Sequence, residues 1–290
     1  MEFQAFGSYE EAIADPDVEA VYNPLPNHLH VPWSIRCAEA GKHVLCEKPI
    51  SLSVEECKTL IAARDKAGVK IGEAFAVRTH PQWLRAHELV RSGAIGQLRA
   101  ITAAFSFSNQ DPANVRNILE FGGGAIMDIG CYPIKMSRLL FGEEPVSVAA
   151  VIDRDPQMRI DRLSSVVLGF PSGHCVFTCS MQLVPYQNVQ ILGTKGRIEL
   201  PVPFNPRPDR KCQLLVDNGT DIYGAGVKAE ELPLCDQYTI QADRFSLAVR
   251  GMGEVPTPLE DSMRNMAVIE AVFEAARTGR TISMEANSRS

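Results

Sequence analysis

The 290-residue sequence lacks several features that would place it in a common class of protein. It has no run of Lys and Arg, and 29 basic against 35 acidic side chains give a formal net charge of −6, so no nucleic-acid partner is expected. No window reaches the roughly 18 uninterrupted apolar residues that a membrane span needs, and the first residues do not resemble a signal peptide. These absences predict a cytoplasmic protein that binds neither membranes nor nucleic acid.

The eight cysteines include no Cys-x-x-Cys pair, which argues against a zinc site and against dithiol redox chemistry. Cys175 and Cys179 lie four residues apart in a β-rich stretch, where an even spacing puts both side chains on one face of a sheet. His28 and His30 have no third metal ligand nearby. The cysteines are therefore interpreted as packing residues, and no metal is expected.

The first 75 residues alternate between short apolar runs and helical patterns. Ser8 with Glu11 and Ser53 with Glu56 form capping boxes, which predict two helix starts. A further helix is predicted over 31–40, and strands are predicted over 18–23, 43–46 and 69–74. This alternation is typical of βαβ units, so we predict a doubly wound parallel sheet, or part of one.

The pattern changes after residue 98, where β-like runs follow one another with few helices between them. These runs cover 98–107, 146–152, 164–170, 175–183 and 189–192. A hairpin turn is predicted at 193–196, and a helical pattern returns after Pro256. We therefore predict a large open, mostly antiparallel sheet with helices on one face, and two domains, 1–76 and 77–290.

Lys48 is the sharpest candidate for a functional residue. It follows closely on the predicted strand His43–Cys46, at the carboxyl end where ligands of open α/β sheets bind. The structural alternative is a lysine that caps the sheet edge with its ammonium group in water. The position at the end of a buried strand favours the functional interpretation.

Asp128 and Tyr132 form the second candidate. They follow the run Gly122–Gly124 and lie four residues apart on a predicted helix, so their side chains share one face. A carboxylate and a phenol that meet a lysine can pass a proton to or from an alcohol oxygen, because the ammonium lowers the pKa of the phenol. The alternative is a charge at a helix N-terminus beside a core tyrosine.

These two motifs resemble a known family. Glu47-Lys48-Pro49 is similar to the hallmark tripeptide of the glucose-fructose oxidoreductase, inositol dehydrogenase and rhizopine catabolism (Gfo/Idh/MocA) family, and 122–132 is similar to its glycine-rich helix start. The likeness covers nearly the whole chain. Most members have histidine where this chain has Tyr132. The tyrosine, with 186–187 and 201–205, resembles the branch of glucose-fructose oxidoreductase, xylose dehydrogenase and dihydrodiol dehydrogenase.

The resemblance implies an oxidoreductase that moves a hydride between NADP or NAD and a sugar or polyol. It implies that Lys48 and Tyr132 flank the reacting hydroxyl or carbonyl, with Tyr132 as proton donor or acceptor and Asp128 orienting the sugar. Arg78 and His80 resemble residues that close over the nicotinamide. The alternative is that they lie in solvent at the start of a helix. The cofactor-binding residues implied in this way are Asn23, Pro24, Leu25, Asn27, His30, Glu47, Lys48 and Arg78.

The sequence has no Gly-x-Gly-x-x-Gly segment, which normally brings the backbone close to the cofactor pyrophosphate. The resemblance implies that the chain begins just before the fourth strand of the cofactor sheet, leaving strand 18–23 with one bare edge and uncovered apolar faces. The protein is then expected to be either part of a longer enzyme or a cofactor-free homologue that acts as a binding or assembly subunit. The resemblance also implies a homodimer or homotetramer formed through the open sheet, and a purely structural partner is a third hypothesis.

Overall fold

The computed structural model describes residues 4–284, which form two compact units. The first unit contains Met1–Phe75 and Gln241–Met266, and the second contains Ala76–Ile240 and Ala267–Ser290. The predicted ranges, 1–76 and 77–290, left the whole C-terminal part in the second domain. The contacts between residues instead assign 241–266 to the first unit.

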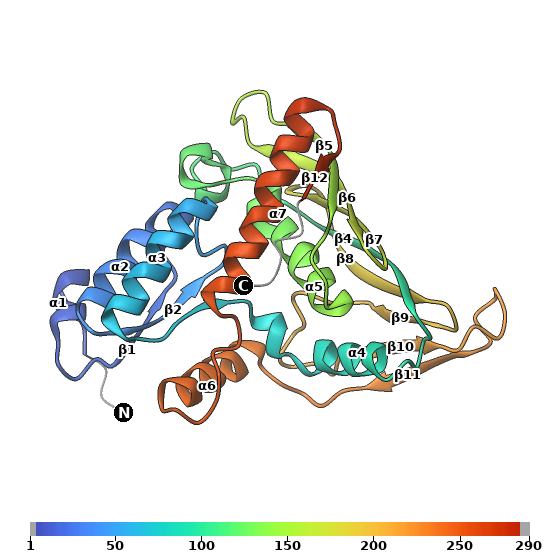
Figure 1. Ribbon diagram of the computed structural model, residues 1–290, viewed down its shortest axis with the longest axis horizontal. Coiled ribbons are helices and arrows are strands. Elements are labelled where there is room, and N and C mark those ends of the chain that lie inside the picture. The colour runs from blue at the N-terminus through green and yellow to red at the C-terminus, as the bar shows by residue number, and fades with distance from the viewer. Residues whose placement is uncertain (1–3, 285–290) are drawn as a thin grey trace. The chain divides into compact units, whose positions relative to one another are not determined.

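The first unit is built on a parallel sheet of β1 (Ala20–Asn23), β2 (His43–Glu47) and β3 (Ile71–Ala74), with β2 in the middle (Figure 1). Asn23 lies opposite Cys46, and Glu47 lies opposite Ala74. All three strands therefore end at the same edge. This sheet confirms the predicted Rossmann-like fold.

Three helices accompany these strands: α1 (Tyr9–Ala14), α2 (His30–Glu39) and α3 (Val54–Ala67), with a 3-10 turn at Asn27–Leu29 before α2. The predicted capping boxes are present, since Ser8 Oγ accepts the N–H of Glu11 and Ser53 Oγ accepts the N–H of Glu56. Helix α3 ends at Gly68, whose φ of 68° suits glycine.

Apolar side chains cover both faces of this sheet because alternate residues of β2 point in opposite directions. Val44 packs with Val31 of α2 and Leu60 of α3, whereas Leu45 packs with Phe245 of α6 (Gln237–Val249). The expectation of uncovered apolar faces is wrong, because α6, which comes from the C-terminal part of the chain, covers the face on which Leu45 lies. The segment that follows α6 lies along the edge of β3, where Thr257 O accepts the N–H of Glu73.

The second unit is dominated by a large mixed sheet. In the described chain its strand order is β11-β10-β9-β8-β4-β7-β6-β5-β12, and β4 with β7 is the parallel pair in this otherwise antiparallel order. The strands are β4 (Leu98–Ser108), β5 (Ser147–Arg154), β6 (Asp161–Phe170), β7 (Gly173–Ser180), β8 (Gln182–Gly193), β9 (Arg197–Leu200), β10 (Gln213–Asp217), β11 (Val227–Glu231) and β12 (Ile282–Ser283). The predicted open sheet is confirmed, and 193–196 is the turn between β8 and β9.

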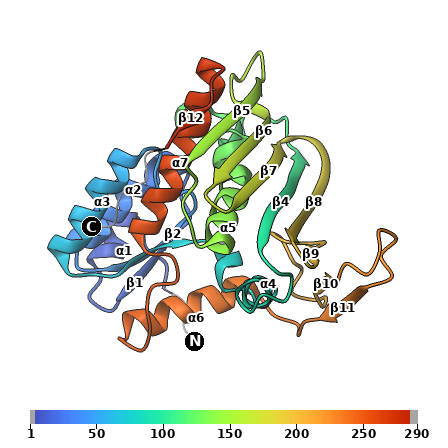
Figure 2. The ribbon, with the colours of Figure 1, turned by 45° about the vertical axis from the view of Figure 1, so that its right-hand side comes forward.

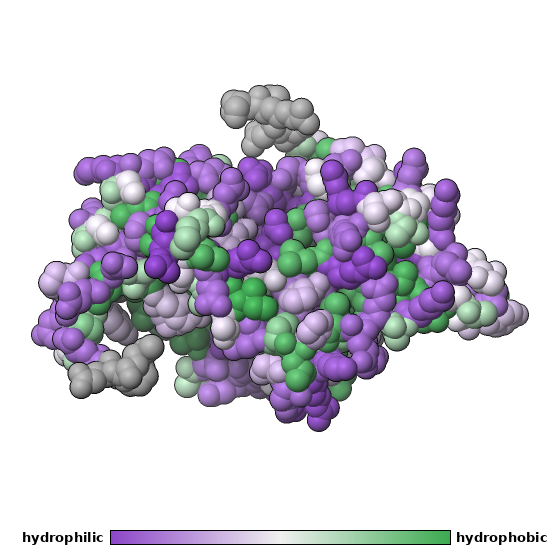
Figure 3. All heavy atoms as spheres, turned by 90° about the horizontal axis from the view of Figure 1, so that it is seen from below, coloured by the Kyte–Doolittle hydropathy of each residue, from purple (hydrophilic) through white to green (hydrophobic). Residues whose placement is uncertain are grey.

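Helix α5 (Cys131–Phe141) lies beside the middle strands of this sheet (Figure 2). The chain also forms α4 (Pro81–Arg91) and the long α7 (Leu259–Thr278). The sequence patterns predicted the helix after Pro256 but not α4, α6 or β9–β11. Among residues 4–284 no helix is both long and apolar enough to cross a membrane. On the face shown in Figure 3, hydrophobic residues lie scattered among hydrophilic ones.

Candidate functional site

Lys48 begins the turn that follows the central strand β2. Its side chain is half-buried, and its peptide bond to Pro49 is cis. Glu47 fixes the start of this turn, because one carboxylate oxygen accepts the N–H of Lys48 at 3.1 Å and the other accepts the hydroxyl of Tyr22 at 2.5 Å. The structure therefore places Glu47 and Lys48 together at the carboxyl edge of the parallel sheet, as the sequence predicted.

Asn23 ends β1 and His30 begins α2, on either side of the loop that joins them, but both side chains are buried and bonded to the protein itself. The amide nitrogen of Asn23 lies 3.2 Å from both the carbonyl oxygen of His30 and the hydroxyl of Ser34, and its amide oxygen accepts the N–H of Leu25. These contacts make Asn23 a support of the loop. Pro24 is exposed in the same loop.

His30 joins this loop to the Lys48 turn. Its Nδ1 lies 2.8 Å from Pro49 O and its Nε2 lies 2.6 Å from Leu25 O. A neutral imidazole has one N–H and donates to one of these carbonyls, whereas an imidazolium donates to both. Burial lowers the pKa of His30, and the two carbonyls act against that effect.

Asp128 and Tyr132 lie together in the second unit, across an irregular helix start. Residues Ile126–Gly130 form a π turn in which the N–H of Cys131 reaches back five residues to Ile126 O, and α5 continues from Cys131. Such turns are frequent at functional sites. The sequence had predicted a regular helix here.

The carboxylate of Asp128 accepts the Nε–H of Arg116 at 3.1 Å. Asp128 is mostly buried, whereas Arg116 is half-exposed. A charge-assisted bond of this kind fixes the position of the carboxylate. Sequence reasoning did not identify Arg116, because it lies in a loop that carries no motif.

The glycine-rich turn packs directly against a buried carboxyl group. Gly124 has a φ of 124°, and a Cβ at this position would lie 1.9 Å from Asp161 Oδ1. Asp161 Oδ2 accepts the N–H of Ile126 at 2.6 Å, so it holds the first residue of the π turn. Burial raises the pKa of Asp161 to about 6, although the Ile126 N–H opposes the shift. Asp161 was not predicted from the sequence.

An aromatic cluster fixes the ring of Tyr132. Its centroid lies 5.9 Å from that of Phe105 and 5.5 Å from that of Phe204, and Phe204 stacks on Phe105 at 4.8 Å. Phe204 is fully buried, and Gln187 Oε1 accepts its backbone N–H. The segments 186–187 and 201–205, quoted above for their resemblance, therefore meet beside Tyr132.

Arg78 and His80 follow β3 along the chain and belong to the second unit. Arg78 is partly buried in the 3-10 turn Ala76–Thr79. His80 caps α4, because its Nδ1 accepts the N–H of Gln82, and its Nε2 lies 3.3 Å from Cys235 Sγ. Burial lowers the pKa of His80 to about 4, so the ring is neutral at physiological pH.

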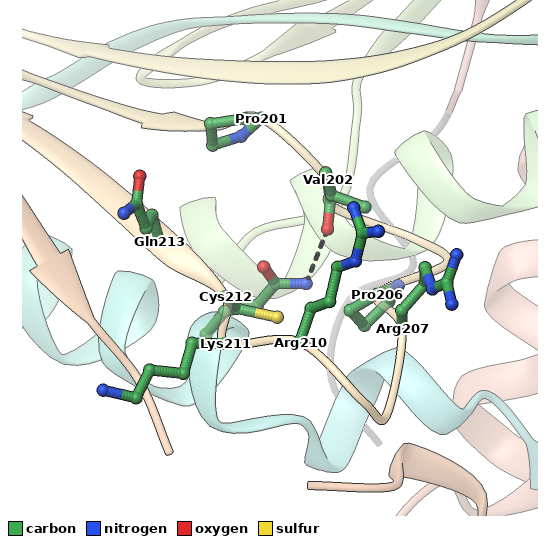
Figure 4. Close-up of a pocket in the computed structure, with 9 residues that line it drawn as sticks. Pro201, Val202, Pro206, Arg207, Arg210, Lys211, Cys212 and Gln213 are labelled. Carbon is green, nitrogen blue, oxygen red and sulfur yellow. Dashed lines mark hydrogen bonds between the residues drawn. The ribbon is translucent and has the colours of Figure 1, made fainter. Parts of the chain in front are cut away.

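A pocket of about 260 Å³ lies beside the loop between β9 and β10 (Figure 4). Its lining includes Arg207, Arg210 and Lys211 and no acidic side chain. Arg207 is paired with Asp209 and Lys211 with Glu231, which leaves the charge of Arg210 as the excess. The pocket therefore suits an anionic group. None of these residues was singled out from the sequence.

The fold and these residues define a nicotinamide-dependent oxidoreductase with a Rossmann-like unit and a mixed-sheet unit. Residues 1–75 match the oxidoreductase family with an NAD-binding Rossmann fold, and residues 83–199 match the GFO/IDH/MocA C-terminal domain. The chain belongs to the Gfo/Idh/MocA family of oxidoreductases. The resemblance noted in the sequence is thereby confirmed.

The proteins that the chain resembles include some whose names carry NADP. The chain is 48% identical to the uncharacterised oxidoreductase ORF334 of Rhizobium meliloti, covering 95% of this chain and 83% of that protein. It is 36% identical to D-xylose 1-dehydrogenase (NADP(+)) 2 of Haloferax volcanii, covering 97% and 85%. The crystal structure of a 3-ketoreductase of Actinomadura kijaniata with NADP and TDP-benzene matches with a TM-score of 0.85 at 28% identity, covering 92% and 81%. The cofactor is NAD or NADP, and the protein is an enzyme, as predicted.

Proposed function

We propose that the protein oxidises or reduces a sugar or polyol at a single carbon, using NADP or NAD. The observation that carries this proposal is Lys48 at the carboxyl end of the central strand β2, in a chain that also bears Asp128 and Tyr132 around the π turn. The D-xylose dehydrogenase relative supports a sugar as the substrate. Solved structures of the 3-ketoreductase include a tyrosine-to-phenylalanine and a lysine-to-alanine variant, which also draws attention to these residue types.

The accessible groups at the end of the sheet fit the ribose and nicotinamide part of the cofactor. Pro24 and Leu25 offer an apolar surface there, and Asn27, Glu47 and Lys48 offer polar groups for hydroxyls and an amide. When bound, the nicotinamide supplies the hydride acceptor or donor. Asn23 and His30 shape this surface from beneath rather than line it, because their side chains are already bonded to the protein.

In the oxidation direction, Tyr132 takes the proton from the substrate hydroxyl as the carbon–hydrogen bond gives up its hydride, and a carbonyl forms. In the reduction direction Tyr132 returns that proton to the new alkoxide. Lys48 stabilises the negative charge that develops on the oxygen, as an ammonium group does in an oxyanion site. Asp128, held by Arg116, accepts hydrogen bonds from neighbouring hydroxyls and so orients the sugar.

Cofactor titration followed by a substrate screen tests this proposal. NADPH and NADH are titrated into the protein while the fluorescence of Trp33 and Trp83 is followed, and aldoses and polyols are then screened by nicotinamide absorbance. Lys48→Met and Tyr132→Phe should each lower kcat by orders of magnitude without changing the circular dichroism spectrum. Near wild-type turnover in both variants would refute the roles assigned to these residues.

We further propose that a second copy of the chain covers the open sheet. The strand register puts Val151, Val167, Val176, Val184 and Tyr186 on one face. Val151 and Val184 are each 75% exposed, and an apolar face of this kind favours a symmetric interface.

Light scattering after size exclusion measures the oligomeric state directly. The double variant Val167→Lys with Val176→Lys should give monomers, whereas Leu234→Lys, which changes an exposed residue outside the sheet, should not. A monomeric wild-type protein would refute the interface.

All eight cysteines are free, as is usual in reducing compartments, and the cytoplasm stays the proposed location.

A further inference from the structure

Two buried side chains bond to the peptide group between Pro49 and Ile50, one residue after Lys48. His30 Nδ1 lies 2.8 Å from Pro49 O, and Glu73 Oε1 accepts the N–H of Ile50 at 2.9 Å. His30 is 1% exposed and Glu73 is 4% exposed, so both contacts are shielded from water. Hydrogen bonds in such surroundings are strong, and removing one partner leaves a buried polar group unsatisfied.

The two contacts come from elements on either side of the central strand β2. His30 begins α2 after β1, and Glu73 lies in β3, while Lys48 follows the central strand β2. His30 also contacts Leu25 O through Nε2, and the backbone N–H of Glu73 donates to Thr257 O. The backbone of Glu73 is therefore anchored, and His30 lies between two carbonyls, of which the neutral ring donates to one.

We propose that Glu73 and His30 are positioning residues for Lys48. The inference rests on the proposed function, in which the Lys48 ammonium acts at the reacting oxygen. Catalytic groups must be held within a fraction of an ångström of their working position, and a displacement of about 1 Å can cost about 100-fold in rate. Both bonds hold the same Pro49–Ile50 peptide group, one at its carbonyl oxygen and one at its N–H, and so limit how far the backbone that carries the Lys48 side chain can move.

Substitutions at Glu73 separate this role from a general loss of stability. At saturating cofactor and the best sugar from the screen, Glu73→Ala should lower kcat by about 10- to 100-fold while the Kd for NADPH stays within about two-fold. Glu73→Gln should retain most of the activity, because its amide oxygen still accepts the Ile50 N–H. The matched control is Glu56→Ala, which loses a carboxylate bond to the N–H of Leu52 at 2.8 Å in the same unit.

His30 provides a second, independent pair of variants. The side-chain nitrogen of asparagine can take the place of Nδ1, so His30→Asn should keep more activity than His30→Leu. Equal loss in both members of either pair, or a loss of NADPH affinity as large as the loss of kcat, would overturn the positioning role. Wild-type kcat in Glu73→Ala would overturn it as well.

Chemical labelling tests the same inference without turnover. The rate at which formaldehyde and borohydride methylate Lys48, relative to Lys58, whose side chain is exposed on α3, is read by peptide mass spectrometry. The relative rate should rise several-fold in Glu73→Ala, because a loosened turn frees the half-buried amine, and should stay unchanged in Glu56→Ala. An unchanged rate in Glu73→Ala refutes positioning. If Lys48→Met keeps full turnover, the proposed function fails, whereas the labelling result still decides whether Glu73 holds the turn.

Discussion

The buried carboxyl of Asp161 should make the second unit less stable at neutral pH than at mildly acidic pH. Burial raises the pKa of Asp161 from 3.8 to about 6. A carboxyl whose pKa is raised by folding destabilises the native state once it ionises, and that penalty disappears below the pKa of the unfolded chain. At about 1.4 kcal/mol per pKa unit, ionisation of Asp161 lowers the free energy of unfolding by about 3 kcal/mol once the pH is above about 6.

Asp161→Asn removes the charge but keeps an oxygen that can accept the Ile126 N–H. Between about pH 5 and about pH 8, the wild-type protein should therefore lose about 1.4 kcal/mol of unfolding free energy relative to this variant. Urea unfolding followed by fluorescence measures the difference. A Trp33→Phe background leaves Trp83, which is 1% exposed and belongs to the second unit, as the reporter.

Asp155→Asn is the matched control. The Asp155 carboxyl is exposed in the same unit, and its hydrogen bond from Gln182 lowers its pKa below 3.8, so it stays ionised across this pH range. Its variant should differ from wild type by the same amount at every pH tested. A pH-independent difference between wild type and Asp161→Asn would show that Asp161 does not carry an ionisable charge into the core, and would refute the reasoning.

Four further variants test the packing and the turns. Phe204→Ala should cost about 3–5 kcal/mol of unfolding free energy, measured with urea, because it empties a fully buried site in the aromatic cluster. Ser53→Ala should cost about 1 kcal/mol by the same measurement, because it removes the N-cap of α3. Gly124→Ala should give little folded protein on expression, because its Cβ would lie 1.9 Å from Asp161 Oδ1; Gly68→Ala, with open space around its Cβ, should fold at a cost of about 1 kcal/mol.

The parts of the fold that the sequence predicted are those with short-range signals. Capping boxes, hydrophobic periodicity and strand ends act over about 15 residues or fewer, and they located α1–α3 and β1–β3 to within a few residues. Helix α6 could not be assigned to the first unit in this way. Its Phe245 covers the sheet beside Leu45, about two hundred positions earlier, and no local pattern records such a contact.

Local patterns also locate a residue without showing where its side chain points. Asn23 and His30 flank the loop after β1, where cofactor contacts were expected, but their side chains are bonded to the loop and to the Lys48 turn. The π turn before α5 was missed for a related reason. The turn packs closely against β7, where a Cβ on Gly130 would lie 3.1 Å from Cys179 Sγ, and the glycine run alone does not indicate this tertiary contact.

The two units use the same kind of support beneath their proposed reactive residues. In the first, Glu73 accepts the N–H of Ile50, 23 residues earlier in the chain, just after Lys48. In the second, Asp161 accepts the N–H of Ile126, 35 residues earlier, just before Asp128. A residue that reacts must be of a particular chemical type and so leaves a motif, whereas a carboxylate that supports a turn only has to arrive at the right place after folding. Sequence reasoning therefore missed these two supporting carboxylates, and they are where substitutions should impair the proposed chemistry without touching the substrate.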